Sequence, residues 1–102
     1  DNHFYEDLAI VEIDGKAGFV DKNGNQVIAP VYDKLGKFSN GLAWFKADSK
    51  YGYIDKTGTV IIPAEYIDAS DFTIDGAAKV QVAKKKGAYI DTTGNIICTY
   101  KL

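Results

Sequence analysis

The stretch Gly52-Tyr53-Ile54-Asp55-Lys56-Thr57-Gly58 decides the fold, because the chain of 102 residues contains it three times in related form. An earlier copy reads Gly-Phe-Val-Asp-Lys-Asn-Gly over residues 18–24, and a later copy reads Ala-Tyr-Ile-Asp-Thr-Thr-Gly over residues 88–94. Self-similarity at a period of about 34–36 residues is typical of folds that stack one small structural unit on the next. The chain is therefore expected to be a tandem array.

A second motif precedes each copy and divides the chain into units. Its copies are Phe4-Tyr5-Glu6-Asp7-Leu8-Ala9, Phe38-Ser39-Asn40-Gly41-Leu42-Ala43 and Phe72-Thr73-Ile74-Asp75-Gly76-Ala77-Ala78, of which the third carries one inserted residue. The first two units also carry a proline and a tyrosine near their ends, and the third has no proline. Three units thus cover approximately residues 4–37, 38–71 and 72–102, within one domain of residues 1–102.

Each unit is expected to form about three short antiparallel strands, so the predicted fold class is all-β. In the first unit the strands are predicted at residues 8–13, 17–21 and 26–28. Asp14 and Gly15, between two apolar strands, predict a type I′ hairpin turn, because both central residues of that turn need positive φ.

The second turn of each unit is Asp-x-x-Gly, in which the Asp side chain can accept hydrogen bonds from the following backbone and the Gly can adopt positive φ. The structural turn residues are Asp14, Gly15, Asp21, Gly24, Asp55, Gly58, Asp91 and Gly94. Longer and less tightly defined loops are expected at residues 47–50 and 83–86. A single helical turn is the most that residues 33–37 and 67–71 are expected to form.

Alternation along the first strand of each unit separates two faces. One set is apolar in every unit, which predicts that it faces the core; it comprises Ala9, Val11, Ile13, Ala43, Phe45, Ala47, Ala78, Val80 and Val82. The other set changes from apolar to charged between units, which predicts that it faces solvent; it comprises Ile10, Glu12, Trp44, Lys46, Lys79 and Gln81. Stacked units of this kind form either an open spiral or a closed pseudo-three-fold array, and residues 1–5 could cap one end.

The chain resembles the bacterial WG (or KWG) repeats on the residues quoted above, over essentially its whole length. The family pattern is close to Lys-x-Trp-Gly-Tyr-Ile-Asp-x-x-Gly-x-x-Val-Ile-x-Pro-x-Tyr, then Phe-x-x-Gly-Leu-Ala. This chain has Ala17, Tyr51 and Gly87 where the family has its Trp, and Ala88 where the third copy should have its Gly. The resemblance implies a β-rich array that is usually part of a larger bacterial protein, without a shared enzymatic activity.

Composition narrows the possible functions. The formal net charge is −2, and all twelve basic residues are Lys, which does not favour nucleic-acid binding. No apolar run is long enough for membrane insertion. One His and one Cys exclude a zinc cluster and an internal disulfide. The absence of Met indicates a processed product or part of a longer chain.

No catalytic constellation emerges, so the chain is expected not to be an enzyme and to need no cofactor or metal. His3 lies in a terminal segment, and Cys98 is interpreted as a buried small hydrophobe. The repeated Asp21, Asp55 and Asp91 are interpreted as turn residues rather than calcium ligands. The run at residues 84–86 is interpreted as a solvated lysine tip.

Binding is predicted on Trp44, Lys46 and Lys79, with Trp44 exposed as an interaction hot spot or, alternatively, packed against a neighbouring unit or residues 32–38. The leading hypothesis is a non-catalytic module for protein or peptide interaction. The alternatives are a carbohydrate or cell-wall ligand stacked on exposed aromatic rings and a purely structural spacer. A single Cys fits either the cytoplasm or an exported protein, so the compartment stays open.

Overall fold

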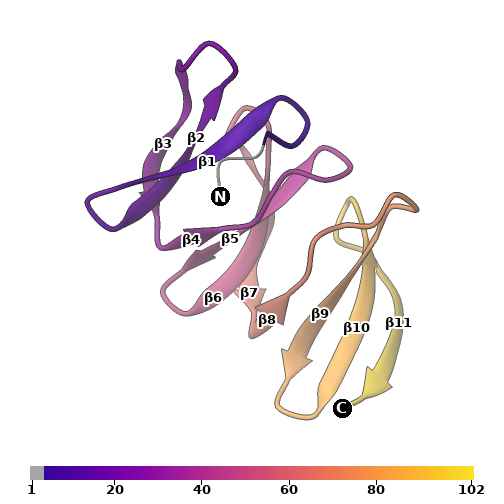
Figure 1. The fold of residues 1–102 in the computed structure, drawn as a ribbon. Helices are drawn as coiled ribbons and strands as arrows, with labels where there is room; N and C mark the ends of the chain where they lie inside the picture. Colours follow the sequence, from indigo (N-terminus) through magenta and orange to yellow (C-terminus); the bar gives the residue numbers. More distant parts are fainter. Residues whose placement is uncertain (1–3) are drawn as a thin grey trace.

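A computed structural model describes residues 4–102, whose regular secondary structure is entirely β (Figure 1). The strands form three small antiparallel sheets. The first sheet contains β1 (Leu8–Ile13), β2 (Lys16–Asp21) and β3 (Gln26–Tyr32); the second contains β4 (Lys34–Leu35), β5 (Leu42–Ala47), β6 (Lys50–Asp55) and β7 (Val60–Tyr66); and the third contains β8 (Asp68–Ala69), β9 (Ala77–Ala83), β10 (Lys86–Asp91) and β11 (Ile96–Lys101). The prediction of an all-β fold of three tandem repeats is confirmed.

Two short strands connect the sheets. β4 continues the chain from β3 but pairs with β5, and β8 continues from β7 but pairs with β9. The backbone N–H groups of Asp33 and Gly36 donate to the carbonyl oxygens of Lys46 and Trp44, at 3.1 and 2.9 Å. The prediction of a helical turn at residues 33–37 and 67–71 is therefore wrong, because pairing with the next hairpin holds both segments extended.

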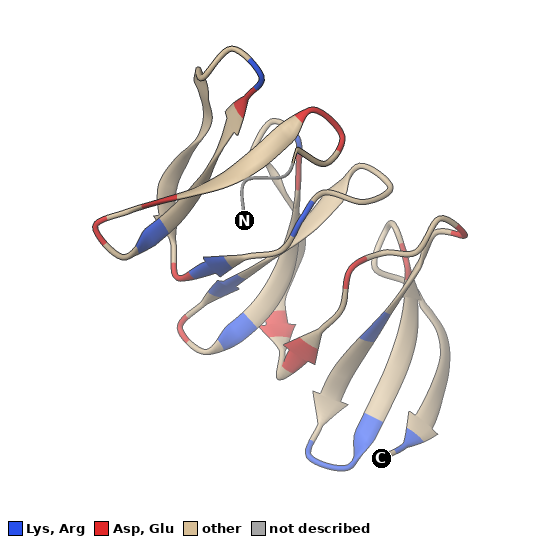
Figure 2. Cartoon of the chain, in the orientation of Figure 1, with Lys and Arg blue, Asp and Glu red and all other residues tan. Residues whose placement is uncertain are grey.

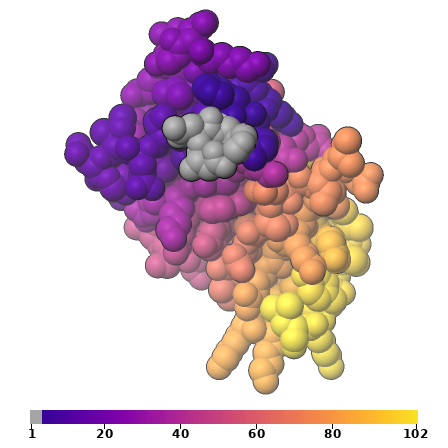
Figure 3. Space-filling view, viewed as in Figure 1, coloured from indigo at the N-terminus to yellow at the C-terminus, as the bar shows by residue number. Residues whose placement is uncertain are grey.

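The three sheets follow one another along the molecule as an open stack, with overall extents of 42 × 28 × 23 Å (Figures 1 and 3). One apolar cluster joins the first and second sheets, and it includes Phe19, Ile28, Phe45 and Ile54. A second cluster joins the second and third sheets; it includes Tyr53, Ile62, Val80 and Ile90. Of the two arrangements left open by the sequence, the structure has the open one.

The middle sheet is covered on both faces, which corrects the prediction that one face of each first strand meets solvent. Ala43 and Phe45 belong to the first cluster, whereas Leu42 belongs to the second cluster and Trp44 packs against it. Ile10 is likewise half-buried against the first cluster. By contrast, Ile13, which was predicted to face the core, is exposed, because no sheet covers that side of the first sheet among residues 4–102.

The first hairpin turn is as predicted, and the second is tighter than predicted. Asp14 and Gly15 have φ values of 53° and 80°, as a type I′ turn requires. In the second unit, Asp48 and Ser49 have φ values of 51° and 68°, so the loop expected at residues 47–50 is also a two-residue turn between β5 and β6. The left-handed conformation is tolerable there because Asp is among the non-glycine residues that adopt it most readily.

The Asp-x-x-Gly turns are braced as predicted. Asp55 Oδ1 accepts hydrogen bonds from the backbone N–H groups of Thr57 and Thr59 and from the Thr57 hydroxyl. Gly58 adopts a φ of 87°. Asp21 and Asp91 accept the equivalent backbone hydrogen bonds in their own turns. The Thr57 hydroxyl, assisted by the backbone donors, holds the pKa of the Asp55 carboxyl below its usual range.

A β-bulge in β7 explains why the second unit has Gly52 where the third unit has Ala88. Residues 63–65 of β7 lie opposite Gly52, because Tyr51 pairs with Tyr66 while Tyr53 pairs with Ile62. A Cβ at Gly52 would come within 2.5 Å of the Ile62 carbonyl oxygen. In the third sheet β11 has no such bulge, and Ala88 pairs directly with Thr99. A methyl group therefore fits at Ala88 but not at Gly52.

Candidate functional site

Trp44, the leading binding residue predicted from the sequence, is half-buried. Its indole lies over Gly36 in the connecting segment, so closely that a Cβ on Gly36 would overlap the ring. The ring of Tyr51 meets it edge-on, with 5.4 Å between the centroids. The alternative in which Trp44 packs against residues 32–38 is confirmed. The expectation of an exposed ring is wrong, because the indole packs on Gly36 in the connecting segment.

Lys46 lies beside this aromatic pair. Its ammonium group is 5.6 Å from the centroid of the Tyr51 ring, within the range of a cation–π interaction. Its backbone carbonyl oxygen accepts the hydrogen bond from Asp33. The structure therefore brings Trp44 and Lys46 together around Tyr51, whereas the third predicted binding residue, Lys79, lies in the next sheet.

The third sheet fills the corresponding region differently. Lys79 stands at the position of Trp44, and Gly87 at the position of Tyr51. The ring of Tyr100 reaches across from β11 and lies over Gly87, because a Cβ on Gly87 would come within 2.5 Å of that ring. The Lys79 ammonium is 6.0 Å from the Tyr100 centroid. Tyr100 thus supplies, from a neighbouring strand, a ring at the place that Tyr51 occupies in the second sheet.

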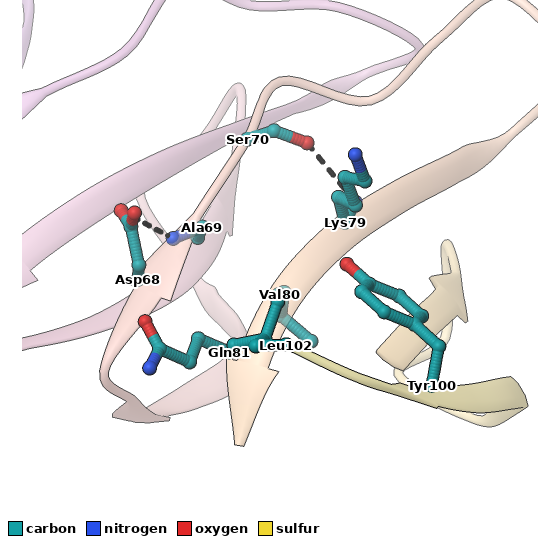
Figure 4. A pocket seen from close by; sticks show the side chains of 8 residues that line it. All are labelled: Asp68, Ala69, Ser70, Lys79, Val80, Gln81, Tyr100 and Leu102. Carbon is teal, nitrogen blue, oxygen red and sulfur yellow. Dashed lines mark hydrogen bonds between the residues drawn. The ribbon is translucent and has the colours of Figure 1, made fainter. Parts of the chain in front are cut away.

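A pocket of about 240 Å³ opens where this replacement is incomplete (Figure 4). Its lining residues are Asp68, Ala69, Ser70, Lys79, Val80, Gln81, Tyr100 and Leu102. It lies between the connecting segment and β9, which is the place that the indole of Trp44 occupies between Gly36 and β5 in the second sheet. The pocket therefore lies at the position in the third sheet that corresponds to the Trp44 indole in the second.

The pocket wall combines apolar and polar side chains, two of which are charged. Tyr100 and Leu102 supply an aromatic ring and an aliphatic side chain, and Lys79 and Asp68 supply opposite charges. The Gln81 amide nitrogen donates to the carbonyl oxygens of Ala83 and Lys84, which fixes the orientation of the amide. Ser70 Oγ accepts a hydrogen bond of 3.0 Å from the backbone N–H of Lys79. An aromatic surface flanked by fixed polar groups is typical of binding sites for small organic groups and side chains.

The outer face of the third sheet, defined by Lys79, Tyr89, Cys98 and Tyr100, continues from this pocket. The register places Tyr89 opposite both Lys79 and Cys98. The Tyr89 and Tyr100 rings are 5.4 Å apart between centroids. Cys98 is an exposed free thiol, so the prediction of a buried Cys98 is wrong. Its equivalents in the first two sheets are buried because another sheet packs over them.

The remaining chemical candidates are solvated or lie outside the described residues. His3, and the part of the proposed cap before Phe4, lie outside them. Lys84, Lys85 and Lys86 are exposed. The tip of the β9–β10 hairpin is blue in Figure 2, the colour of lysine positions. Residues 4–102 contain no group of three or more His, Cys, Asp or Glu side chains arranged to hold a metal ion. That same part of the chain has no helix long and apolar enough to cross a bilayer.

Sequence reasoning did not identify Tyr100, Gln81, Asp68 or Leu102 as site residues. A joint signal was present, because three positions differ together between the second and third sheets: Gly36 is replaced by Ser70, Trp44 by Lys79, and Tyr51 by Gly87. Each change is unremarkable alone. Together they remove the indole, the glycine on which it packs and the neighbouring tyrosine ring from one place.

Comparison with known proteins agrees with the repeat pattern. Two adjacent stretches, residues 18–51 and 51–85, each match the family model described as "WG containing repeat". No curated protein matches the chain.

Proposed function

Because the chain belongs to the family of WG-containing repeats, we propose that it is a non-catalytic module of a larger bacterial protein and binds a protein or peptide. The observation that carries the proposal is the pocket between the connecting segment and β9, at the place that Trp44 fills in the preceding sheet. A side chain supplied by a partner would take the role that Trp44 plays within the chain.

The shape of the pocket favours an aromatic side chain of an extended peptide. The internal counterpart is an indole that contacts a connecting strand on one side and a tyrosine ring on the other. In the third sheet Tyr100 provides the ring, and the connecting segment around Ser70 provides the opposite wall. Lys79 and Asp68 would then contact charged or polar groups on either side of the inserted ring. Aromatic anchors of this kind dominate the energetics of many interfaces.

A pocket-filling variant tests the proposal. Ser70→Gly with Lys79→Trp reproduces Gly36 and Trp44, so the fold should tolerate both changes. A displayed peptide library is selected on the wild-type chain, and the enriched peptides are then measured on the filled variant. We expect binding at least about tenfold weaker on the filled variant, equivalent to a loss of about 1.4 kcal/mol.

Lys85→Trp is the matched control, because it adds a tryptophan on the same hairpin outside the pocket lining. It should leave peptide binding unchanged. Equal binding by the wild type and the filled variant would move the peptide site away from the pocket. A library from which the wild-type chain enriches nothing would contradict the peptide-binding proposal itself.

A carbohydrate ligand is the second candidate, and the pair formed by the exposed Tyr89 ring and the half-buried Tyr100 ring favours it. Adjacent aromatic rings provide stacking surfaces for sugar faces. A glycan array probed with the wild type and with Tyr89→Ala separates the two candidates. Signals lost in the variant would support the glycan, whereas an array without signals would count against it. If neither peptides nor glycans bind, a structural spacer is the better interpretation.

A further inference from the structure

The tip of the β9–β10 hairpin differs in charge from the two hairpin tips that precede it. The first tip reads Asp-Gly-Lys over residues 14–16, and the second reads Asp-Ser-Lys over residues 48–50. The third reads Lys-Lys-Lys over residues 84–86. This tip therefore carries three positive charges, whereas each of its counterparts carries one charge of either sign.

A fourth lysine extends this charge onto β11. In the first sheet, Lys16 forms an ion pair with Asp33. The corresponding residues of the third sheet are Lys86 and Lys101, and the register places them directly opposite each other. Figure 2 shows the blue hairpin tip beside the blue end of β11. Because like charges directly opposite each other destabilise a sheet, the third sheet has a repulsion where the first has an attraction.

Hydrogen bonds hold the backbone of the third tip in place. The Gln81 amide nitrogen donates to the carbonyl oxygens of Ala83 and Lys84 at 3.2 and 3.1 Å. The Leu102 backbone N–H donates to the Lys85 carbonyl oxygen at 3.1 Å. The lysine side chains thus extend from a braced hairpin, so a ligand that binds them does not have to order a mobile loop.

The lysine tip comprises four exposed side chains, those of Lys84, Lys85, Lys86 and Lys101. Within residues 4–102, none of the four forms an ion pair, whereas three other lysines do, namely Lys16, Lys22 and Lys56. The other eight lysines and all fourteen acidic residues belong to the rest of the chain, which therefore has a formal charge of −6 against +4 at the lysine tip. The positive charge is thus concentrated at one place and is not neutralised there by ion pairs.

Exposure of the lysine tip does not depend on the third sheet being the last one. The second sheet has a neighbouring sheet on both faces, and yet Asp48, Ser49 and Lys50 at its hairpin tip are exposed. The sheets stack through their faces, whereas the hairpin tips lie at the side of the stack (Figure 1). A further repeat packed on the third sheet would therefore leave the lysine tip in solvent.

We propose that the lysine tip binds an acidic segment of a protein partner, whose Asp or Glu carboxylates contact the four ammonium groups. Charge complementarity of this kind selects a partner and speeds its association. The ion pair between Lys16 and Asp33 shows the same contact within the chain. The site goes beyond the proposed function, because none of the four lysines lines the pocket.

A short acidic segment fits this surface better than an extended polyanion does. Nucleic acid or an anionic bilayer would reach beyond the lysine tip and meet the rest of the chain, which is negative. The chain also has no Arg, the residue that contacts phosphate groups through two parallel hydrogen bonds. Lysine ammonium groups are point charges, which pair with single carboxylates.

A fluorescein-labelled hexaglutamate peptide tests the proposal by fluorescence anisotropy. We expect the wild-type chain to bind it with a Kd below about 1 mM at low salt. Binding should weaken between about 20 and 150 mM salt, because salt screens exposed charges. A variant with all four lysines of the tip changed to Gln should raise the Kd at least about tenfold, because each exposed charge pair contributes a small factor. A wild-type Kd above about 1 mM at low salt would overturn the proposal.

The matched control also changes four exposed lysines to Gln, at Lys22, Lys34, Lys50 and Lys56. It has the same net charge as the tip variant but keeps the lysine tip. Its Kd should stay within about twofold of the wild-type value, because only the long-range field changes. Circular dichroism verifies that both variants fold. Equal weakening in the two variants would mean that net charge alone governs binding, which would also overturn the proposal.

Lys101→Asp separates binding from stability. It places an acid opposite Lys86, as Asp33 lies opposite Lys16 in the first sheet. The repulsion is then replaced by an attraction, so the urea midpoint should rise while hexaglutamate binding weakens. A raised urea midpoint with unchanged binding would show that Lys101 is not part of the site and would overturn the four-lysine assignment.

Two further probes distinguish the kinds of anion. A short DNA duplex and vesicles containing phosphatidylserine present phosphate groups in place of carboxylates. If either binds more tightly than hexaglutamate and loses that binding in the tip variant, the acidic protein segment is the wrong partner. Weaker binding of both would support the proposal.

The hexaglutamate experiment is independent of the pocket, because the peptide has no aromatic ring. The filled variant, Ser70→Gly with Lys79→Trp, keeps the lysine tip and should bind hexaglutamate as the wild type does. Loss of hexaglutamate binding in that variant would place the acidic segment at the pocket and overturn the separate site. The peptides compared on the Lys85→Trp control are those without Asp or Glu, so that the two sites are measured apart. Failure of either proposal therefore leaves the other standing.

Discussion

The indole of Trp44 rests on Gly36, and no side chain larger than hydrogen fits beneath it. Gly36 belongs to the segment that joins the first sheet to the second, and its backbone N–H donates to the Trp44 carbonyl oxygen at 2.9 Å. One glycine therefore both pairs with β5 and leaves room for the largest side chain on that strand. This contact ties the position of the only tryptophan in the chain to the connection between two repeats.

Gly36→Ala should displace the indole and destabilise the fold by about 1–3 kcal/mol, the usual cost of overpacking a well-filled site. Because Trp44 is the only tryptophan, its fluorescence reports the displacement directly. We expect an emission shift to longer wavelength and a lower urea midpoint. Lys34→Ala, an exposed change in the same connecting strand, is the control and should alter neither. An unchanged emission spectrum in Gly36→Ala would contradict the packing described here.

Gly52→Ala should destabilise the chain by about 1–3 kcal/mol, because the added methyl group meets the backbone of the bulged β7. That backbone is anchored by flanking strand pairs and cannot yield as a side-chain tip would. The third sheet provides the matched comparison. Ala88→Gly lies opposite Thr99, where β11 has no bulge, and should cost only about 0.5–1 kcal/mol, mostly through backbone entropy. Urea denaturation measures the loss of stability in both variants. Equal losses would mean that the bulge does not determine whether glycine or alanine stands at this position.

Local signals in the sequence were sufficient for the strands of the hairpins and most turns. Asp14 and Gly15 predicted the first hairpin turn, and the recurring Asp55 and Gly58 predicted a braced turn that the structure confirms. These features depend on residues within a few positions of one another. The family resemblance rests on such short patterns. The match over residues 18–51 and 51–85 confirms it.

Features that depend on the neighbouring unit were not predictable in this way. Alternation assigned Trp44 to solvent because strand patterning does not reveal that a second sheet covers that face. At residues 33–37 at most a single helical turn was expected, and the short strand β4 was missed because its partner, β5, lies in the next unit. The pocket depends on Tyr100, whose ring lies over Gly87 on the neighbouring strand, and this contact is a property of the pair, not of either residue alone.

Acid should weaken the Asp-x-x-Gly turns. The pKa of the Asp55 carboxyl is lowered, first by the Thr57 hydroxyl, so the folded state favours its ionised form. Its contribution to stability is fully present above the unfolded pKa of about 3.8 and is lost as the pH falls through the lower folded value. Asp55→Asn cannot ionise and should therefore reduce the loss of stability in acid. Urea midpoints compared at about pH 7 and about pH 3 measure the effect.

Thr57→Val is the companion variant for the acid experiment. It removes the hydroxyl donor but keeps the backbone donors to Asp55, so it should reduce the acid dependence only in part. If the wild type and both variants lose stability equally between the two pH values, the carboxyl of Asp55 does not carry the effect.

Tyr53 should control the response to alkali. Its ring is fully buried, and its hydroxyl donates to the Ser70 carbonyl oxygen at 2.6 Å across the interface between two sheets. Burial raises the pKa of this hydroxyl well above its usual range. The folded state therefore favours the neutral phenol, so the associated stability is fully present below the unfolded pKa of about 10 and is lost as the pH rises above it.

Tyr53→Phe removes the hydrogen bond and should lower stability at neutral pH by about 1 kcal/mol, leaving the Ser70 carbonyl without this donor. Because the variant has no buried phenol to ionise, its deficit should shrink as the pH rises above about 10. Urea midpoints across that range measure the difference. Tyr89→Phe, at an exposed ring, should show neither effect. If the stability deficit of Tyr53→Phe were the same at every pH, Tyr53 would stabilise the interface only through packing and hydrogen bonding. The burial of its hydroxyl argues against that outcome, because burial also disfavours ionisation.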